Sequence, residues 1–390
     1  MSLPDPAALA RLALPALVLA SAALALLWWR QSLRSRTALA QLAAITGLAV
    51  FLCFDLVAFG AYTRLSDSGL GCPDWPGCYA QASPVGAASP IASEEAARPT
   101  GPVTERKAWI EMLHRYFAGT VGLLILAMAA LAWRARAQRA HALAWTLGTL
   151  AWYLGQALFG ALTVTWKLYP AIVTGHLLGG LGLLALLAWQ RALYRRDDRG
   201  DQVVALARAQ AGRVPRARGD RRVLALAGAV LAVQVTLGGW VSTNYAVLAC
   251  TGFPGCSGHG WPTLDASAWR EGFTVARALG HRADGGLLPF DSLVAIHWAH
   301  RLFALVAVAV LAWLGTRLRR RPVTRRAAAI LAGLLALQVA TGLSNVVLDW
   351  PLAGALAHTA GAAALVVALC ALAARLRDAV RPPAATHRSP

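Results

Sequence analysis

The sequence is poor in charge, in acidic residues and in cysteine. Only 14% of its 390 residues are charged, whereas a soluble domain carries about a quarter, and this deficit argues against an ordinary cytosolic enzyme. Six cysteines are too sparse for a small disulfide scaffold, and a hydrophobic content of 57% excludes intrinsic disorder. The alternating ten-residue pattern of an outer-membrane barrel is also absent.

Long apolar runs take the place of the missing charge. Nine of them are long enough to cross a bilayer, which requires about 20 residues of helix. Because backbone amides in lipid must form their hydrogen bonds within the segment, we expect these runs to be helices. The sequence therefore predicts an all-α polytopic membrane protein. The runs lie near 7–29, 40–62, 108–133, 140–163, 170–193, 222–243, 291–316, 324–348 and 351–376.

The net charge of +19 comes from arginines in the loops between these runs. Basic clusters follow the first, third, fifth and seventh runs and end the chain. Cytoplasmic loops of membrane proteins carry such an excess. We therefore expect a bacterial plasma (inner) membrane protein with its N-terminus outside and its C-terminus in the cytoplasm. Membrane lipid is an expected partner, and nucleic acid is not.

Rare residues recur at matching intervals in the two halves of the chain, over a repeat of about 180 residues. The segment GCPDWPGC places Cys72 six residues before Cys78, and ACTGFPGC does the same for Cys250 and Cys256. We therefore predict two pseudo-symmetric four-helix bundles in a parallel internal repeat, preceded by one extra N-terminal span.

This repeat divides the chain into five parts. Residues 80–104, which are rich in Ala, Ser and Pro, are expected to form a flexible external loop within the first bundle. The parts are an extra N-terminal helix with its basic loop (1–36), an N-terminal bundle (37–195), a basic cytoplasmic linker (196–221), a C-terminal bundle (222–378) and a disordered tail (379–390).

Four histidines lie at similar depths within the apolar runs, near the external face. A histidine in lipid is costly and usually faces the interior of a bundle. Two imidazoles that face each other across a bundle can be the axial ligands of a haem iron. An interhelical hydrogen bond is the alternative for each histidine, and zinc is disfavoured because no third or fourth ligand lies at this depth. The pairs are His114 with His176 and His300 with His358.

One acidic residue distinguishes the two halves. Glu111 lies three residues before His114 on the same helix face, whereas His297 has the equivalent position before His300. Glu111 is either a helix-entrance carboxylate stabilised by the helix dipole or a group beside a haem edge that takes a proton or stabilises a developing cation. The asymmetry between the halves favours the second interpretation. His297 is either an alternative ligand or a group that supports one.

The paired cysteines face the oxidising side of the membrane, so Cys72–Cys78 and Cys250–Cys256 could each close a short disulfide. A structural staple is the default interpretation, and a redox-active pair remains open for the first. Three arginines near the same face either pair with haem propionates or extend toward lipid headgroups, namely Arg64, Arg115 and Arg301.

Taken together, these motifs resemble the haem A synthases of bacteria and mitochondria. The resemblance spans residues 40–376 and rests on TRLSDSGLGCPDWPGC (63–78), EMLHR (111–115), TGHLLGG (174–180), HWAHR (297–301) and the late His358. It implies two four-helix bundles and an enzyme that oxidises the C8 methyl of haem O to a formyl for terminal oxidase biogenesis. Two successive hydroxylations with oxygen from water are implied. The extra first span departs from the family's usual eight, and the second cysteine pair is not found in every member.

The resemblance also implies roles for individual residues. His114 and His176, with Arg115, would bind the substrate haem O. The equivalent set in the second bundle would bind a resident haem b cofactor, namely His300, His358 and Arg301. Glu111 would be the catalytic carboxylate, and Cys72–Cys78 a functionally important pair.

Two other functional classes stay open at this point. One is a di-haem electron-transfer cytochrome linked to quinol or thiol, whose haem ligands would normally lie at both depths of the membrane. The other is a haem transporter, in which the histidines would form a transient relay. Haem O synthase is an expected partner, and the sequence leaves the oligomeric state open, including a homo-oligomer.

Overall fold

A computed structural model describes residues 37–134, 136–137, 140–199, 214–256 and 260–378. Within these ranges the chain forms ten α-helices and no extended strand. Eight of the helices are long and apolar enough to cross a membrane, which confirms the predicted all-α polytopic membrane protein. The predicted first span, the centre of the basic linker and the C-terminal tail lie outside the described residues.

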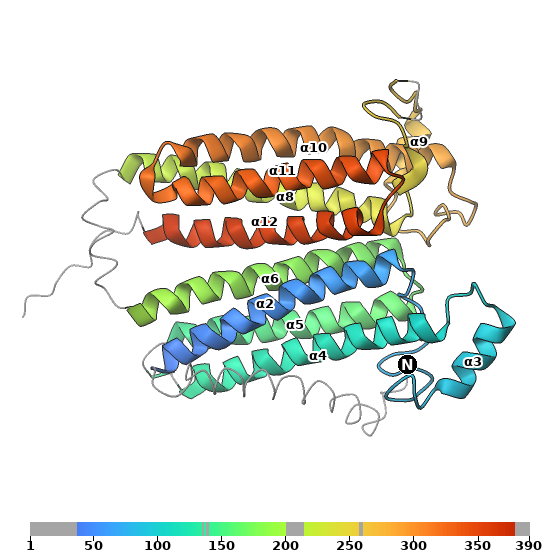
Figure 1. The fold of residues 1–390 in the computed structure, drawn as a ribbon, viewed down its shortest axis with the longest axis horizontal. Helices are drawn as coiled ribbons and strands as arrows, with labels where there is room; N and C mark the ends of the chain where they lie inside the picture. The colour runs from blue at the N-terminus through green and yellow to red at the C-terminus, as the bar shows by residue number, and fades with distance from the viewer. Residues whose placement is uncertain (1–36, 135, 138–139, 200–213, 257–259, 379–390) are drawn as a thin grey trace, which may run out of the picture.

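Eight membrane helices form two groups of four that lie side by side (Figure 1). In the N-terminal bundle they are α2 (Ala38–Leu65), α4 (Glu105–Arg134), α5 (Ala140–Thr165) and α6 (Pro170–Arg199). In the C-terminal bundle they are α8 (Val214–Thr243), α10 (Phe290–Arg319), α11 (Arg325–Val347) and α12 (Leu352–Asp378). The two bundles pack through α2 and α6 on one side and α8 and α12 on the other.

Two short helices lie at one end of the bundles, which we call the loop end (residues 66–104 and 244–289). They are α3 (Ala88–Ala97) and α9 (Ala266–Gly272), and Figure 1 shows both on the same side of the molecule. The segment 80–104, which was expected to form a flexible external loop, thus contains the helix α3. The reason is that Ile91 is buried in a cluster with both Cys72 and Cys78, which fixes the segment against α4.

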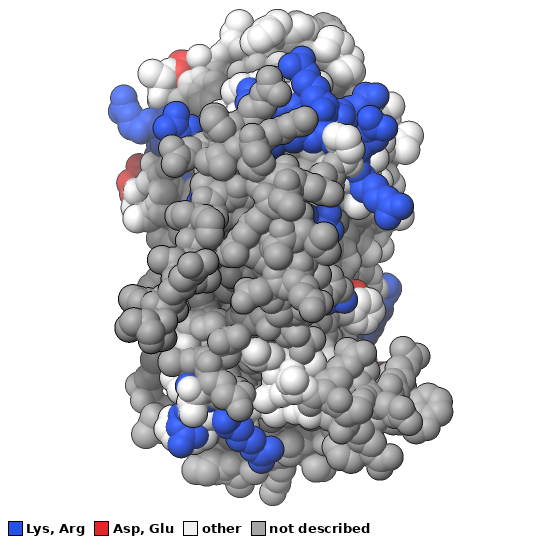
Figure 2. All heavy atoms as spheres, turned by 90° about the vertical axis from the view of Figure 1, so that its left-hand side faces the viewer, with Lys and Arg blue, Asp and Glu red and all other residues white. Residues whose placement is uncertain are grey.

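The opposite end of the bundles, the basic end, carries most of the described arginines. Figure 2 views this end and shows Lys and Arg side chains gathered chiefly over the C-terminal bundle, with little acidic surface beside them. The buried carboxylate of Asp220 pairs there with Arg317 at 3.2 Å and Arg321 at 2.9 Å. The helices run further than the predicted linker boundaries, since α6 continues to Arg199 and α8 begins at Val214.

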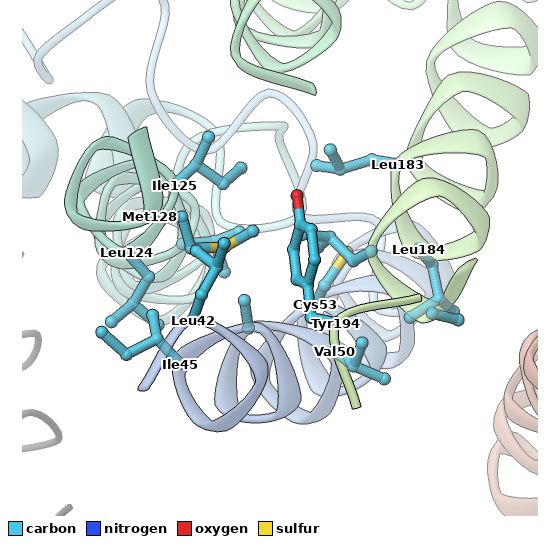
Figure 3. Close-up of a cluster of buried hydrophobic side chains, with 14 of the residues drawn as sticks. Leu42, Ile45, Val50, Cys53, Leu124, Ile125, Met128, Leu183, Leu184 and Tyr194 are labelled. Atoms are coloured by element: carbon cyan, nitrogen blue, oxygen red, sulfur yellow. The ribbon is translucent and has the colours of Figure 1, made fainter. Parts of the chain in front are cut away.

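The core of the N-terminal bundle is apolar, and the few polar side chains in it form hydrogen bonds with one another. Figure 3 shows Leu42 and Ile45 of α2 beside Leu124 and Met128 of α4 within one buried cluster. In the same cluster the Tyr194 hydroxyl donates to Gln190 and lies 3.0 Å from the Thr146 hydroxyl. Such pairing is required because an unpaired polar group in a membrane interior is costly.

Polar contacts near the loop end join the two bundles. The Arg64 guanidinium at the end of α2 donates to the carbonyl of Ser242 in α8 and lies 3.8 Å from the ring centroid of Tyr245. The Tyr245 hydroxyl donates to Asp67 at 2.9 Å. Arg64, one of the three predicted propionate partners, thus contacts the neighbouring bundle in this structure.

Candidate functional site

The four predicted ligand histidines share one packing arrangement. Each comes from the second or fourth helix of its bundle and lies over a glycine of the preceding membrane helix. A side chain at that glycine would press on the imidazole, so the glycine leaves room for the ring. A Cβ on the glycine would lie this far from the histidine Cε1: 3.1 Å for Gly60 and His114, 3.3 Å for Gly160 and His176, 2.9 Å for Gly238 and His300, and 3.1 Å for Gly342 and His358.

In the N-terminal bundle, His114 comes from α4 and His176 from α6. The Nδ1 atoms of both rings are buried and have no hydrogen-bond partner among the described residues. Phe59 of α2 lies beside His114, with its ring centroid 6.0 Å away. Two imidazoles on facing helices suit the axial ligands of a haem iron, which they would bind through Nε2. Within the described part of the chain, their Nδ1 atoms lack the protein partner that a permanent metal ligand usually has. The arrangement fits a haem held between α4 and α6.

In the C-terminal bundle, His300 of α10 and His358 of α12 form the corresponding pair. Here both Nδ1 atoms have partners. The Gln234 amide nitrogen lies 3.1 Å from Nδ1 of His300, and the Thr341 hydroxyl lies 3.0 Å from Nδ1 of His358. Sequence reasoning missed both partners, although a polar residue near each contact glycine could have indicated them.

Among the described residues, no group of three or more His, Cys, Asp or Glu side chains gathers as a metal cluster would require. The histidines therefore come as two pairs on facing helices. A pair of imidazoles matches the two axial positions of a haem iron, whereas structural zinc takes four protein ligands.

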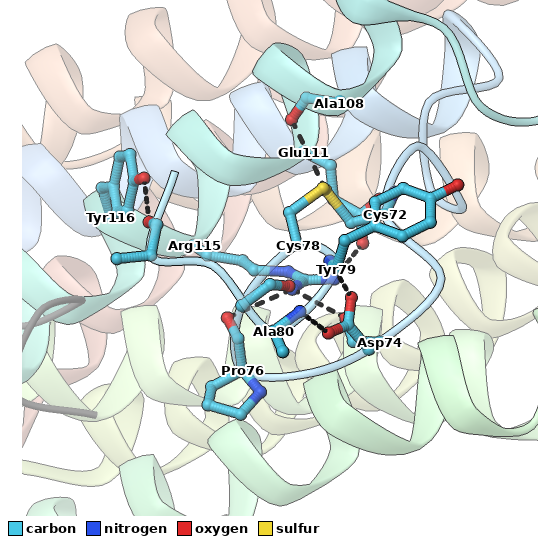
Figure 4. Close-up of a disulfide and its surroundings, with 12 residues drawn as sticks. Cys72, Asp74, Pro76, Cys78, Tyr79, Ala80, Ala108, Glu111, Arg115 and Tyr116 are labelled. Carbon is cyan, nitrogen blue, oxygen red and sulfur yellow. Dashed lines mark hydrogen bonds and ion pairs between the residues drawn. A yellow bond between two sulfur atoms is a disulfide. The ribbon is translucent and has the colours of Figure 1, made fainter. Parts of the chain in front are cut away.

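Glu111 lies at the loop end of α4, one turn from His114, and is almost fully buried. Its Oε2 accepts from the backbone N–H of Cys72 at 2.8 Å, and its Oε1 is paired with Arg115. Figure 4 shows this carboxylate, the Arg115 guanidinium and the Cys72–Cys78 disulfide as one unit. Glu111 thus links the disulfide loop to the helix that carries His114.

The disulfide loop is closed by backbone contacts. Arg115 donates to the carbonyls of Asp74 at 2.9 Å and Pro76 at 3.2 Å, and to that of Gly77. A Cβ on Gly77 would lie 2.4 Å from the Gln81 carbonyl oxygen, which accounts for the glycine of the Pro-Gly-Cys motif. The loop therefore has little room for side-chain substitution.

Asp74 and Tyr79 make further contacts at this loop. The carboxylate of Asp74 accepts from the N–H groups of Tyr79 at 2.7 Å and Ala80 at 2.6 Å. Burial, together with the negative charges of Glu94 and Asp74, raises the pKa of the Tyr79 phenol above its usual value. The phenol beside the disulfide therefore stays protonated near neutral pH.

The C-terminal bundle repeats this construction with one change. Arg301 donates to the carbonyls of Gly252 at 2.7 Å and Gly255 at 2.9 Å, beside the Cys250–Cys256 disulfide. His297 stands where Glu111 stands in the first bundle. Its Nδ1 lies 3.1 Å from the Ala246 carbonyl and its Nε2 accepts from Arg301 at 3.2 Å. Both ring nitrogens are thus engaged, and the structure favours a supporting role over ligation.

Two of the arginines that were predicted to pair with haem propionates donate hydrogen bonds to protein carbonyls in this structure. Arg115 and Arg301 both direct donors to the carbonyls of a disulfide loop. Each side chain is therefore held in place by the protein. Their pairing with a propionate remains a prediction.

Comparison with known proteins gives a consistent set of relatives. Residues 43–370 match the model of the COX15-CtaA family, described as "Cytochrome oxidase assembly protein". The chain is similar to the "Heme A synthase" of Shewanella oneidensis, with 38% identity over 325 residues that cover 83% of this chain and 93% of the relative. The "Heme A synthase" of Methylobacterium nodulans is 30% identical over 363 residues (83% and 89%), and that of Paracoccus denitrificans 28% over 336 residues (80% and 81%).

Proposed function

Since the chain belongs to the COX15-CtaA family of cytochrome oxidase assembly proteins, we propose that it is a haem A synthase, an oxidoreductase that converts the C8 methyl of haem O to a formyl. The observation that carries the proposal is the presence of two histidine pairs on facing helices, with a buried carboxylate beside only one of them. An enzyme that oxidises one haem with the help of another needs two haem sites, and only the substrate site needs an acid–base group beside it.

His114 and His176 bind the substrate haem O in the N-terminal bundle, and Glu111 is the catalytic carboxylate. An iron with two histidine ligands has no open position for O2, so the inserted oxygen comes from water. Each of two successive oxidations joins a water oxygen to the methyl carbon and releases two electrons and two protons. The second gives a carbon with two hydroxyl groups, which loses one water to become the formyl. Glu111 takes up protons, and its hydrogen bonds to Cys72 and Arg115 hold it in position.

In the second bundle, His300 and His358 hold the resident haem b cofactor, which supplies an electron carrier close to the substrate site. The partnered Nδ1 atoms of these histidines support a permanent haem site. His297 in place of Glu111 leaves this bundle without the acid–base carboxylate. This difference supports the assignment of substrate to the first bundle and of cofactor to the second.

The protein's orientation follows from its charge distribution. The arginines of the basic end suit the cytoplasmic face, and the two disulfides at the loop end suit the oxidising side of a bacterial inner membrane. The substrate site thus lies near the external face. Haem O synthase is the proposed partner that delivers haem O.

The direct test is to co-express the full chain with a haem O synthase, extract the haems and determine their masses. Formyl or hydroxymethyl haem is the expected result. If a known synthase modifies haem O under the same conditions and this chain carries only unmodified haem, the proposal is wrong, and an electron-transfer cytochrome becomes the better interpretation.

A further inference from the structure

The two haem sites differ in the residues next to the contact glycines. Gln234 lies four residues before Gly238, whereas the equivalent position before Gly60 is Leu56. Thr341 directly precedes Gly342, and the equivalent residue before Gly160 is Phe159. The C-terminal bundle therefore has two hydrogen-bonding side chains where the N-terminal bundle has two apolar ones. The hydrogen bonds of the histidines differ in the same way. Nδ1 has a partner in both C-terminal histidines and has none, among the described residues, in the two N-terminal ones.

Thr341 fixes the protonation of its histidine. Its hydroxyl donates its single proton to the Leu337 carbonyl at 2.7 Å, so a lone pair of the same oxygen faces Nδ1 of His358 at 3.0 Å. The ring must therefore carry its proton on Nδ1. Nε2 is left with a free lone pair, which is the form that binds iron.

Gln234 holds the other histidine at two points. Its amide nitrogen lies 3.1 Å from Nδ1 of His300 and 3.2 Å from the backbone oxygen of the same residue, while its Oε1 has no partner. The amide is the only neighbour that the structure gives to this Nδ1 within the described residues. The amide nitrogen also lies 3.5 Å from Nε2, so the contacts of Gln234 fix where the ring lies rather than which of its nitrogens carries the proton. When iron takes Nε2, the amide turns so that Oε1 accepts the Nδ1 proton, and its bond to the His300 carbonyl is given up.

We propose that Gln234 and Thr341 are positioning residues that hold the two C-terminal imidazoles ready for a haem iron, and that the apolar Leu56 and Phe159 leave the N-terminal site exchangeable. This inference rests on the proposed function. A ligand that is already oriented loses less freedom on binding, and an Nδ1–H acceptor makes the imidazole a stronger donor. A cofactor site needs retention, whereas a substrate site must release its haem.

The test uses the full chain, purified from a host that lacks haem O synthase, so that haem b is the probe at both sites. Haem transfer to excess apomyoglobin and the reduction potential of the retained haem are measured for Gln234→Leu and Thr341→Val. Thr236→Val is the matched control, because Thr236 is a half-buried residue of the same helix, α8, whose hydroxyl, among the described residues, donates to the Ala232 carbonyl. Gln234→Glu and Thr341→Ser restore an acceptor.

We expect haem to bind about 10- to 100-fold more weakly in Gln234→Leu and Thr341→Val. The potential should rise in both, because the histidines become weaker donors. The acceptor-restoring variants should recover retention, with a lower potential in Gln234→Glu. The reciprocal Leu56→Gln should slow haem loss from the N-terminal bundle.

Three results would overturn the inference. Unchanged retention and potential in both Gln234→Leu and Thr341→Val would show that the partners do not position the ligands. Haem loss that Gln234→Glu and Thr341→Ser fail to reverse would indicate a packing role only. A wild-type protein that binds no haem would overturn the proposed function as well, which separates the two failures.

Discussion

The contact glycine beneath His300 allows a sharp test of the proposed haem site in the C-terminal bundle. In Gly238→Ala the new Cβ would lie 2.9 Å from the imidazole Cε1. Since carbon atoms in contact stay about 3.5 Å apart, the ring must retreat by about 0.6 Å. Metal–ligand distances tolerate only about 0.2 Å. We therefore expect the C-terminal bundle to bind its haem about tenfold more weakly, or ~1.4 kcal/mol.

Gly228→Ala is the matched control on the same helix, because its Cβ would meet no atom within 4 Å. Alanine is a better helix former than glycine by about 1 kcal/mol, so neither variant should weaken α8 itself. The assay is haem content per chain and transfer to apomyoglobin after purification. Equal haem retention in the two variants would refute the packing argument, and so would a loss in Gly228→Ala alone.

Three further variants test other parts of the structure. Glu111→Gln keeps the shape but removes the charge, and we expect haem A formation to fall at least about a hundredfold with normal haem b content; full turnover would exclude Glu111 from catalysis. Replacing both Cys72 and Cys78 by serine should cost about 2 kcal/mol and lower the thermal midpoint; an unchanged midpoint would mean that the disulfide adds no stability. Tyr245→Phe removes the 2.9 Å bond to Asp67 and should cost about 1 kcal/mol at most, seen as a small shift in melting; a loss of haem instead would contradict a purely structural contact.

Much of the fold could be predicted because lipid imposes simple rules on sequence. Eight of the nine predicted apolar runs correspond to described helices, since a membrane helix needs a long apolar run and leaves charge in the loops. The histidine pairs stood out because histidine is rare in apolar segments, and the cysteine pairs because both have the same spacing and end in Pro-Gly-Cys. The helix at 88–97 escaped prediction because it depends on the burial of Ile91 against distant residues rather than on its own composition.

The hydrogen-bond partners of the histidines could not be predicted from residue spacing, because they come from segments that meet only in the folded protein. The residue pattern left His297 open between ligand and supporting group, because its bonds to Ala246 and Arg301 form only in the fold. The same holds for Gln234 and Thr341, whose partners lie 66 and 17 residues away. Polar residues in membrane helices often pair between helices, but sequence alone does not say with which group.

The central claim is that haem O is oxidised in the N-terminal bundle, between His114 and His176. The most direct test is to co-express His114→Ala and His176→Ala with a haem O synthase and to determine by mass which haems each variant contains. We expect both variants to retain haem b in the C-terminal bundle and to contain no formyl or hydroxymethyl haem. Formation of haem A by either variant at the wild-type level would contradict this claim.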